Sequence, residues 1–295
     1  MSGSRPATRV VLAAAAVVVG VLTGCASTVP PAATGSVAPL TRATTTTATT
    51  TPAARPRAAP PLRVLLTDDD GYRAGGIRAV RAALARAGYD VTVVAPDGNR
   101  SGAGAQTSDE QDPQDTDDPG VRTVKGTPAD AVIAGLAAMR AAGRPPDLVV
   151  SGTNLGRNTG SGITESGTVG AAVTAAHDGL PAIAVSTDKA EDEADCATTA
   201  AFVARLVGAL AAPRPPFAPG LVLNVNHPVK KASGLTWLPP EQISLDGDQM
   251  ELEGGDDGDD DGGLGRGRAT IAELDADGQD GTPASVRDRL AGLSP

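Results

Sequence analysis

The sequence predicts an α/β domain, built on a mostly parallel sheet with helices on both faces. Three observations predict this fold class. Short, continuous runs of Val, Leu and Ile alternate with longer Ala-rich stretches, which is the pattern of buried parallel strands separated by helices. The chain of 295 residues is 40% hydrophobic, enough for a core of ordinary size. Only 2% of its residues are aromatic, so Ala, Val, Leu and Ile must fill that core.

The first 24 residues are predicted to be a lipoprotein signal peptide. Arg5 and Arg9 precede an apolar run over residues 10–22, which is too short to span a bilayer comfortably. The run ends in Leu22-Thr23-Gly24-Cys25, which resembles a bacterial lipobox. We therefore expect an exported protein, anchored to the membrane of the cell envelope by a lipid on Cys25. A plain signal peptide and an uncleaved anchor stay open as alternatives.

A disordered Thr/Pro/Ala-rich linker is predicted over residues 25–61. Residues 26–61 contain no acidic side chain, and eight threonines occur within residues 41–51. Such a segment has too little apolar surface to offset the entropy of ordering it. Cys196 is the second of the two cysteines, and we expect it to be an unreactive residue of the core.

The alternation of elements begins near Leu62. The predicted strands are Val64–Leu66, Val91–Ala95, Leu148–Val150, Ile183–Val185 and Leu221–Val225. The predicted helices are Gly76–Ala87, Pro128–Ala142, Thr168–His177 and Thr198–Ala211. In the first helix Ile77, Val80 and Leu84 fall on one apolar stripe, and Gly88 follows at the position of a helix stop.

Three polar, Gly-rich loops follow three of these strands. The first is Asp68-Asp69-Asp70-Gly71, the second spans residues 96–104, and the third spans residues 151–168. Because ligands of such sheets bind outside the carboxyl ends of the strands, we expect the loops to converge there. Their carboxylate, hydroxyl and amide oxygens suit a hard cation such as Mg²⁺ or Mn²⁺. The third loop ends in Ser166-Gly167-Thr168 at a helix start, where backbone N–H groups favour a phosphate.

Each of these features also has a structural explanation. An Asp-rich turn is often a solvated loop or a helix cap. Ser166 or Thr168 would serve equally as an N-cap of the following helix. Asn154 and Asn158, which lie among glycines, would also suit left-handed turn conformations. The coincidence of three such loops at strand ends favours a binding site.

Six motifs resemble those of the SurE family of survival-protein nucleotidases, and they occur in the family's order. They are "VLLTDDDGYRAGGI", "VTVVAPDGNRSGAG", "VKGTPADAV", "LVVSGTNLGRN", "SGTVGAA" and "LVLNVNHP". The resemblance covers residues 62 to 228 and implies a Rossmann-like, SurE-like catalytic domain over residues 62–232. It also implies a metal-dependent phosphomonoester hydrolase (5'/3'-nucleotidase) acting on nucleoside monophosphates, with Mg²⁺ or Mn²⁺ as cofactor.

The resemblance also implies roles for individual residues. The family's metal ligands match Asp69, Asp70, Ser101 and Asn154. Asn99 and the turn Ser166-Gly167-Thr168 match positions close to the bound phosphate. Asp69 and Asp70 are then the catalytic residues, which orient or deprotonate a metal-bound water that attacks phosphorus.

The chain departs from the family pattern at several places. Asp68 stands where the family usually has asparagine, and Glu165 stands where a tyrosine is common. Residues 109–118 carry six acids in a loop expected near the site. Residues 233–295 form a divergent C-terminal segment with an acidic low-complexity stretch. Because the family uses this region in dimerisation, the divergence leaves a homodimer undecided.

Charge and the acidic runs restrict the alternatives. The net charge of −10 argues against a nucleic-acid partner, since phosphate contacts need clustered Lys and Arg. Asp257 to Gly262 imitates the start of a calcium-binding EF-hand loop, but its twelfth position is Arg268, so we expect a disordered, solvated segment. Two other functions stay open: a haloacid-dehalogenase-like phosphatase with Asp68 as nucleophile, and an inactive envelope lipoprotein that binds nucleotide or metal.

Overall fold

The computed structural model describes residues 60–211, 219–253, 259–276, 286–287, 290 and 292–293. The strands are β1 (Arg63–Thr67), β2 (Asp90–Pro96), β3 (Gln114–Asp115), β4 (Val121–Val124), β5 (Leu148–Leu155), β6 (Ala182–Asp188), β7 (Leu221–Pro228), β8 (Leu235–Trp237), β9 (Glu241–Asp246), β10 (Gln249–Glu253) and β11 (Ala269–Asp275). The helices are α1 (Gly75–Arg86), α2 (Pro128–Ala141), α3 (Gly162–Glu165), α4 (Gly167–His177), α5 (Ala197–Leu210) and α6 (Asp259–Gly265). The predicted signal peptide, the Cys25 anchor and nearly all of the predicted linker lie outside these residues. No described helix has both the length and the hydropathy needed to cross a bilayer.

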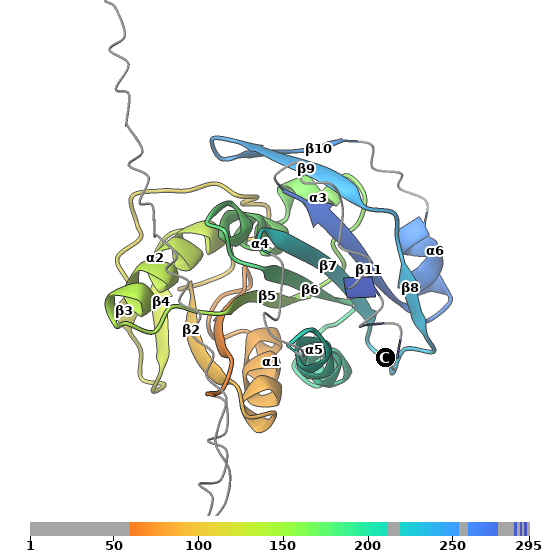
Figure 1. Cartoon of the computed structure of the whole chain (residues 1–295), viewed down its shortest axis with the longest axis horizontal. Coiled ribbons are helices and arrows are strands. Elements are labelled where there is room, and N and C mark those ends of the chain that lie inside the picture. The colour runs from red at the N-terminus through yellow and green to blue at the C-terminus, as the bar shows by residue number, and fades with distance from the viewer. Residues whose placement is uncertain are drawn as a thin grey trace, which may run out of the picture. The chain divides into compact units, whose positions relative to one another are not determined.

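One sheet of eleven strands organises the described residues (Figure 1). Its order is β10-β9-β11-β7-β6-β5-β1-β2-β4-β3, and β8 pairs with β11. The central strands β7, β6, β5, β1, β2 and β4 are parallel to their neighbours in this run. β11 is antiparallel to β7, and β3 is antiparallel to β4. The predicted fold class, a mostly parallel sheet in an α/β domain, is confirmed.

Helices cover both faces of the sheet, as predicted. Figure 1 shows α1 and α5 on one face and α2 and α4 on the other. Successive side chains of a strand point to opposite faces, so each central strand contributes to two cores. In β1, Val64 and Leu66 pack with residues of α1 and α5, whereas Leu65 packs with residues of α2 and α4.

The helices form where the sequence places an apolar stripe between start and stop signals. In α1, Ile77, Val80 and Leu84 are buried, and each such burial contributes about 1.5–3 kcal/mol. Gly88 follows this helix with φ of +88°, a conformation that glycine adopts without strain. The start of α2 is fixed by a capping box between Thr127 and Asp130.

The residues after 232 contribute four strands to the same sheet. β11 pairs with β7, and the β9–β10 hairpin lies beyond it. Ile243 and Met250 of the hairpin are buried, and Met250 lies 3.7 Å from the Cβ position of Gly104 in the second loop. The expectation of disorder throughout the acidic run is wrong for residues 259–262, which begin α6. Leu264 of this helix is buried, and its apolar side chain gives the helix a contact with the domain.

The order of the strands places the three loops at one edge of the sheet. β1 lies between β2 and β5, so the chain leaves β1 to one side for β2 and returns later on the other side as β5. This reversal is the position at which open α/β sheets bind ligands. The third loop begins later than predicted, because β5 continues through Asn154 to Leu155.

Gly76 lets α1 approach β5 closely, and its replacement by alanine tests this packing. A Cβ at Gly76 would lie 1.9 Å from the carbonyl oxygen of Thr153, which belongs to the backbone and cannot move aside. We expect Gly76→Ala to lower the free energy of unfolding by about 3 kcal/mol or more in urea denaturation. Gly265→Ala is the control, since no atom lies within 4 Å of its Cβ position. Equal stabilities of the two variants would contradict this account of the packing.

Candidate metal and phosphate site

The three adjacent aspartates after β1 lie in three different environments. Asp68 is fully buried, and its carboxyl is close to the backbone of Ile77 in α1 and to Cys196 at the start of α5. Asp69 is also buried, but its side chain faces α4. Asp70 is partly buried and faces the second and third loops. The turn after β1 thus directs the three side chains to different neighbours, although the charges of Asp69 and Asp70 still raise the pKa of Asp68.

Asp69 is held against the start of α4. The hydroxyl of Thr168 donates a hydrogen bond of 2.5 Å to Asp69 Oδ1. A Cβ at Gly167 would lie 2.9 Å from Cβ of Asp69, so only glycine leaves room for this approach. The predicted residues Asp69, Gly167 and Thr168 therefore meet, although they are about 100 positions apart in the sequence.

Asp70 joins the three loops to one another. Its Oδ2 accepts a hydrogen bond of 3.0 Å from the N–H of Leu155, which follows Asn154. Its Oδ1 accepts one of 2.7 Å from Asn99 Nδ2 in the second loop. Asn99 Oδ1 in turn accepts the N–H of Ser101 at 3.0 Å. The predicted convergence of the loops is confirmed by these contacts.

Asn154 and Ser101 complete the expected oxygen donors. Asn154 Nδ2 donates to the carbonyl oxygen of Gly156 at 2.7 Å, which leaves Oδ1 as the atom suited to a cation. Neither Asn154 nor Asn158 has a positive φ, since Lys189 is the one such non-glycine residue in the described ranges. The alternative that these asparagines supply left-handed turns is therefore wrong.

Ser166 acts as the N-cap of α4. Its Oγ accepts a hydrogen bond of 3.1 Å from the N–H of Val169. An α-helix leaves the N–H groups of its first turn without partners inside the helix. With Val169 satisfied by the cap, the N–H groups of Gly167 and Thr168 are the ones suited to an anion.

Burial raises the pKa of all three carboxyl groups. Loss of water is the largest cause in each case. The pKa of Asp68 lies well above its usual range, because the charges of Asp69 and Asp70 add to the effect of burial. The pKa of Asp69 rises to about 6, although the Thr168 hydroxyl partly offsets the effect. Burial also raises the pKa of Asp70, and the hydrogen bonds that Leu155 and Asn99 donate to its carboxylate partly offset this rise.

This concentration of negative charge fits a bound cation. Among the described residues, no Lys or Arg forms an ion pair with Asp68, Asp69 or Asp70. The residues that the structure describes contain no group of three or more His, Cys, Asp or Glu side chains that could hold a metal. The expected ligands instead combine two carboxylates with a hydroxyl and an amide, the all-oxygen set that Mg²⁺ and Mn²⁺ accept.

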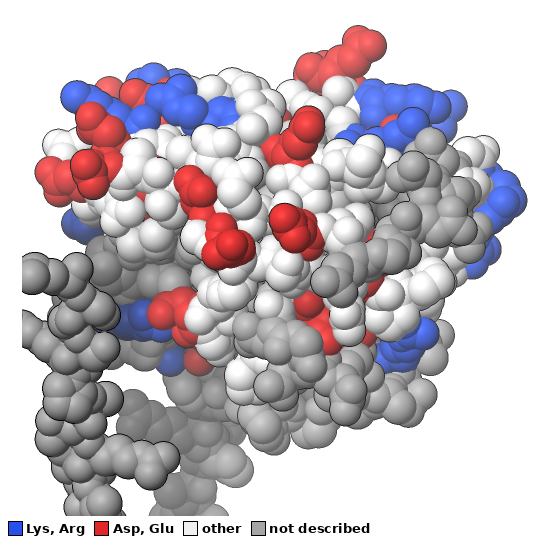
Figure 2. All heavy atoms as spheres, turned by 90° about the horizontal axis from the view of Figure 1, so that it is seen from above, with Lys and Arg blue, Asp and Glu red and all other residues white. Residues whose placement is uncertain are grey.

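The acidic loop of residues 109–118 is partly balanced by arginines. Arg122 binds Asp115 at 2.9 Å, and Arg81 binds Asp118 at 2.5 Å. Figure 2 shows the molecule from above, where Asp and Glu lie both in the middle of the face and at its upper margin and Lys and Arg lie toward the margins. Two of the six acids in this loop are therefore paired with arginines.

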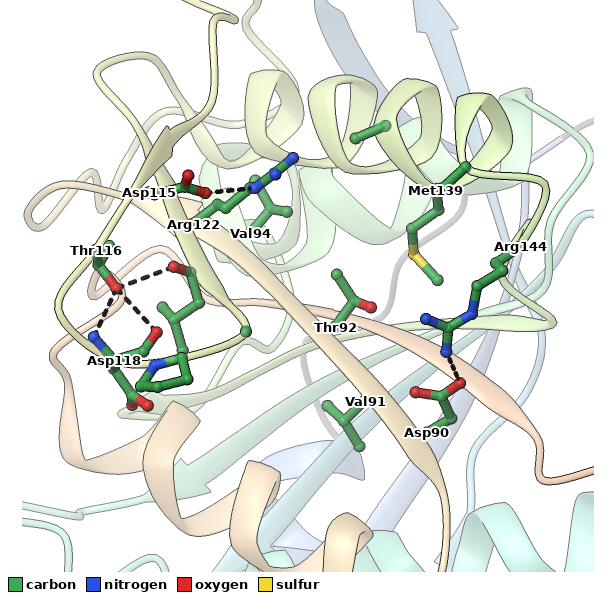
Figure 3. A pocket seen from close by; sticks show the side chains of 15 residues that line it. Asp90, Val91, Thr92, Val94, Asp115, Thr116, Asp118, Arg122, Met139 and Arg144 are labelled. Carbon is green, nitrogen blue, oxygen red and sulfur yellow. Dashed lines mark hydrogen bonds and ion pairs between the residues drawn. The ribbon is translucent and has the colours of Figure 1, made fainter.

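A large cavity lies elsewhere and contains none of the predicted site residues. It has a volume of about 540 Å³ and lies between β2, β4 and the C-terminal part of α2 (Figure 3). Asp90 and Val121, which begin β2 and β4, line it together with Met139. It therefore opens at the amino ends of these strands, whereas the three loops lie at the carboxyl ends.

Several contributors to the site were not predicted from the sequence. The N–H of Leu155 binds Asp70 through the backbone, and a backbone donor leaves no signature in a sequence. Asn224 and Asn226 of β7 bind the third loop through Asn158. Their signal is present in "LVLNVNHP", where two amides occupy alternate positions of a buried strand, and thus the same face.

Relatives of known name match most of the domain. A segment of the chain is 47% identical over 158 residues to the 5'-nucleotidase SurE of Treponema pallidum, covering 51% of this chain and 83% of that protein. It is 44% identical over 170 residues to the 5'/3'-nucleotidase SurE of Cronobacter sakazakii, covering 57% of this chain and 64% of the relative. The chain thus spans less than two thirds of the latter protein's length.

A solved structure has the same fold. The crystal structure of the SurE protein from Aquifex aeolicus superposes with a TM-score of 0.60 and 28% sequence identity. The superposition covers 79% of this chain and 100% of the Aquifex aeolicus chain. The family described as "Survival protein SurE" matches residues 64–243, which include the three loops and the β7 asparagines. The chain belongs to the SurE family.

Proposed function

We propose that this protein is a metal-dependent 5'-nucleotidase, which hydrolyses the phosphomonoester of nucleoside monophosphates. The named relatives are 5'-nucleotidases or 5'/3'-nucleotidases, and the resemblance to their family implies metal dependence. The single observation that carries the proposal is the junction of Asp69 with Thr168 and of Asp70 with Asn99 and Leu155. This junction places a carboxylate pair beside a helix N-terminus, as phosphoryl transfer with a cation requires.

The metal ligands in this proposal are Asp69, Asp70, Ser101 and Asn154. A divalent cation bound there supplies Lewis-acid polarisation of the phosphoryl group and lowers the pKa of a bound water. Asp69 and Asp70 would hold the cation, and one of the two carboxylates would accept the proton of the attacking water. The Thr168 hydroxyl keeps the Asp69 carboxylate in one orientation, and Asn99 and the Leu155 N–H do the same for Asp70.

The start of α4 binds the phosphate in this proposal. The N–H groups of Gly167 and Thr168 and the positive end of the helix dipole stabilise the charge that grows on the transferring phosphoryl group. Ser166 contributes by capping the helix, which fixes the direction of its first turn. Asn99 donates to Asp70, and the resemblance to the family assigns it to the surroundings of the phosphate.

The position of Asp68 argues against the haloacid-dehalogenase alternative. A covalent nucleophile must reach phosphorus, but Asp68 has an exposure of 0% and lies on the α1 and α5 side of the sheet. Its Oδ1 accepts the N–H of Asp70 at 3.4 Å. An inactive binding protein is distinguished from an enzyme by turnover alone.

Phosphate release from nucleoside monophosphates tests the proposed activity. We expect turnover by the purified soluble domain with Mn²⁺ or Mg²⁺ and its loss on chelation, because the carboxylate pair needs a cation to act. Asp69→Ala and Asn154→Ala should each lower kcat/KM by about 100-fold or more. Asp178→Ala, at the far end of α4 where Asp178 pairs with Arg140, is the matched control and should retain activity.

Two results would contradict the proposal. Turnover that persists after chelation would exclude the metal. Equal activity of the wild type, Asp69→Ala and Asn154→Ala would exclude the assigned residues. A wild-type protein that binds Mn²⁺ but releases no phosphate from any nucleoside monophosphate would favour the inactive binding protein.

The buried carboxyl of Asp68 should make the stability of the metal-free protein depend on pH. Its pKa in the folded state is raised, so between the unfolded pKa and the folded pKa the folded protein holds a proton that the unfolded chain has lost. Stability therefore falls as pH rises above about 4. We expect Asp68→Asn to raise the melting temperature at pH 8 and the difference to narrow toward pH 4.

A matched variant separates burial from loss of charge in this experiment. Asp246→Asn removes an exposed carboxyl group of the β9–β10 hairpin and should leave the melting temperature unchanged. Both variants are compared by thermal unfolding after dialysis against a chelator. A stabilisation by Asp68→Asn that is the same at pH 4 and pH 8 would show that ionisation of Asp68 is not the cause.

We also propose that the protein is exported and anchored at the cell envelope by a lipid on Cys25. The support is the sequence order of Arg5 and Arg9, the apolar run and the tetrapeptide ending in Cys25. In a bacterial expression host, metabolic labelling with a fatty acid should mark the wild type and not Cys25→Ala, and Cys196→Ala should be labelled like the wild type. Label retained by Cys25→Ala would overturn the lipid assignment.

A further inference from the structure

Asn158 lies between the expected metal ligand Asn154 and helix α3, and both its backbone groups and its side-chain nitrogen are hydrogen-bonded. Its N–H donates to Asn226 Oδ1 at 2.9 Å. Its carbonyl oxygen accepts Asn226 Nδ2 at 2.9 Å and Asn224 Nδ2 at 3.0 Å. Its side-chain Nδ2 donates to Ser186 Oγ at 2.8 Å. The segment after β5 is therefore fastened to β6 and β7 at one residue.

The side-chain amide of Asn226 makes two hydrogen bonds to the backbone of Asn158, as the backbone of a neighbouring strand would. It accepts the peptide N–H with one atom and donates to the peptide carbonyl with the other. Only a side chain that carries both an acceptor and a donor makes this pair, and Asn has both at the right reach. Asn226 has an exposure of 0%, so water does not compete for these bonds.

A short chain of contacts leads from Asn226 to Asn154. Asn154, Ser186 and Asn226 are neighbours in register across β5, β6 and β7. Asn158, four residues after Asn154, binds the side chains of the other two. Between Asn154 and Asn158, the N–H of Gly156 binds Thr187 O at 3.0 Å, and Gly156 O accepts Asn154 Nδ2 at 2.7 Å. The orientation of the Asn154 amide thus depends on where this segment lies.

We propose that Asn226 is a positioning residue of the metal site, acting through Asn158 and Gly156 on the orientation of Asn154. The inference rests on the proposed function, in which Asn154 Oδ1 is a metal ligand. Asn226 touches neither the metal nor the substrate. It holds the segment whose Gly156 carbonyl oxygen accepts a hydrogen bond from Asn154 Nδ2, so that Oδ1 is the amide atom left for a cation. Residues that orient metal ligands in this way commonly change metal affinity by about 10- to 100-fold.

The affinity of the metal-free protein for Mn²⁺, measured by titration calorimetry, tests this inference without relying on turnover. We expect Asn226→Ala to weaken Mn²⁺ binding about 10-fold or more. Asn226→Asp should do the same, because its second oxygen repels the Asn158 carbonyl. Asn224→Ala is the graded comparison and should weaken Mn²⁺ binding less than Asn226→Ala does, since the Asn158 peptide keeps both of its bonds to Asn226.

A double variant shows whether Asn226 acts through Asn154. If it does, Asn154→Ala with Asn226→Ala binds Mn²⁺ no more weakly than Asn154→Ala alone. Additive losses would overturn the inference, and so would an unchanged Mn²⁺ affinity in an Asn226→Ala protein that only melts earlier. Should Asn226→Ala not fold, Ser186→Ala removes the side-chain bond of Asn158 and is expected to weaken Mn²⁺ binding more than Asn224→Ala does. Absence of Mn²⁺ binding by the wild type would overturn the proposed function and this inference together.

Discussion

The crowding of three carboxyl groups at the end of a buried strand is the constraint on which the rest of the site depends. Asp68 points to the α1 and α5 side, while Asp69 and Asp70 point toward the loops. The turn after β1 separates the charges only partly, and burial raises the pKa of each group. Hydroxyl, amide and N–H donors hold the carboxylates in place, but donors carry no positive charge to balance them. In the proposed function a hard cation supplies that charge, and this is how the packing of the fold supports metal dependence.

Close backbone approach makes this arrangement compact. Gly76 brings α1 against Thr153 of β5, and Gly167 brings α4 against Asp69. A side chain at either position would push a helix away from the edge of the sheet, and with it the groups that the helix presents. Asn224 and Asn226 of β7 also make the site compact, because their hydrogen bonds to Asn158 hold the segment after β5 against the sheet. Glycines therefore allow the close contacts between helices and the sheet, and asparagine amides hydrogen-bond the loop to the sheet.

The C-terminal segment shows where pattern reading from the sequence fails. Its acidic composition resembles that of a solvated tail, yet β9, β10 and β11 join the sheet and α6 packs through Leu264. The alternation of Ile243 and Leu245 with polar residues is a strand pattern, but the surrounding charge obscures it. What stabilises the hairpin is contact with residues of the second loop and α3, such as Met250 beside Gly104. Such contacts join residues about 150 positions apart, and no local pattern records them.

The sequence by itself determined the alternation of buried strands and helices, the family, and the residues that the three loops offer as oxygen donors. These features are local, because apolar periodicity, turn residues and motif spacing are all written within a few neighbouring positions. The tertiary structure alone decided which aspartate faces which side, that Ser166 caps α4 while Thr168 binds Asp69, and that Asn226 pairs with the Asn158 peptide. The reason is physical: strand order and helix packing bring together groups that are far apart in the chain, and the burial that raises the carboxyl pKa values exists only once those contacts have formed.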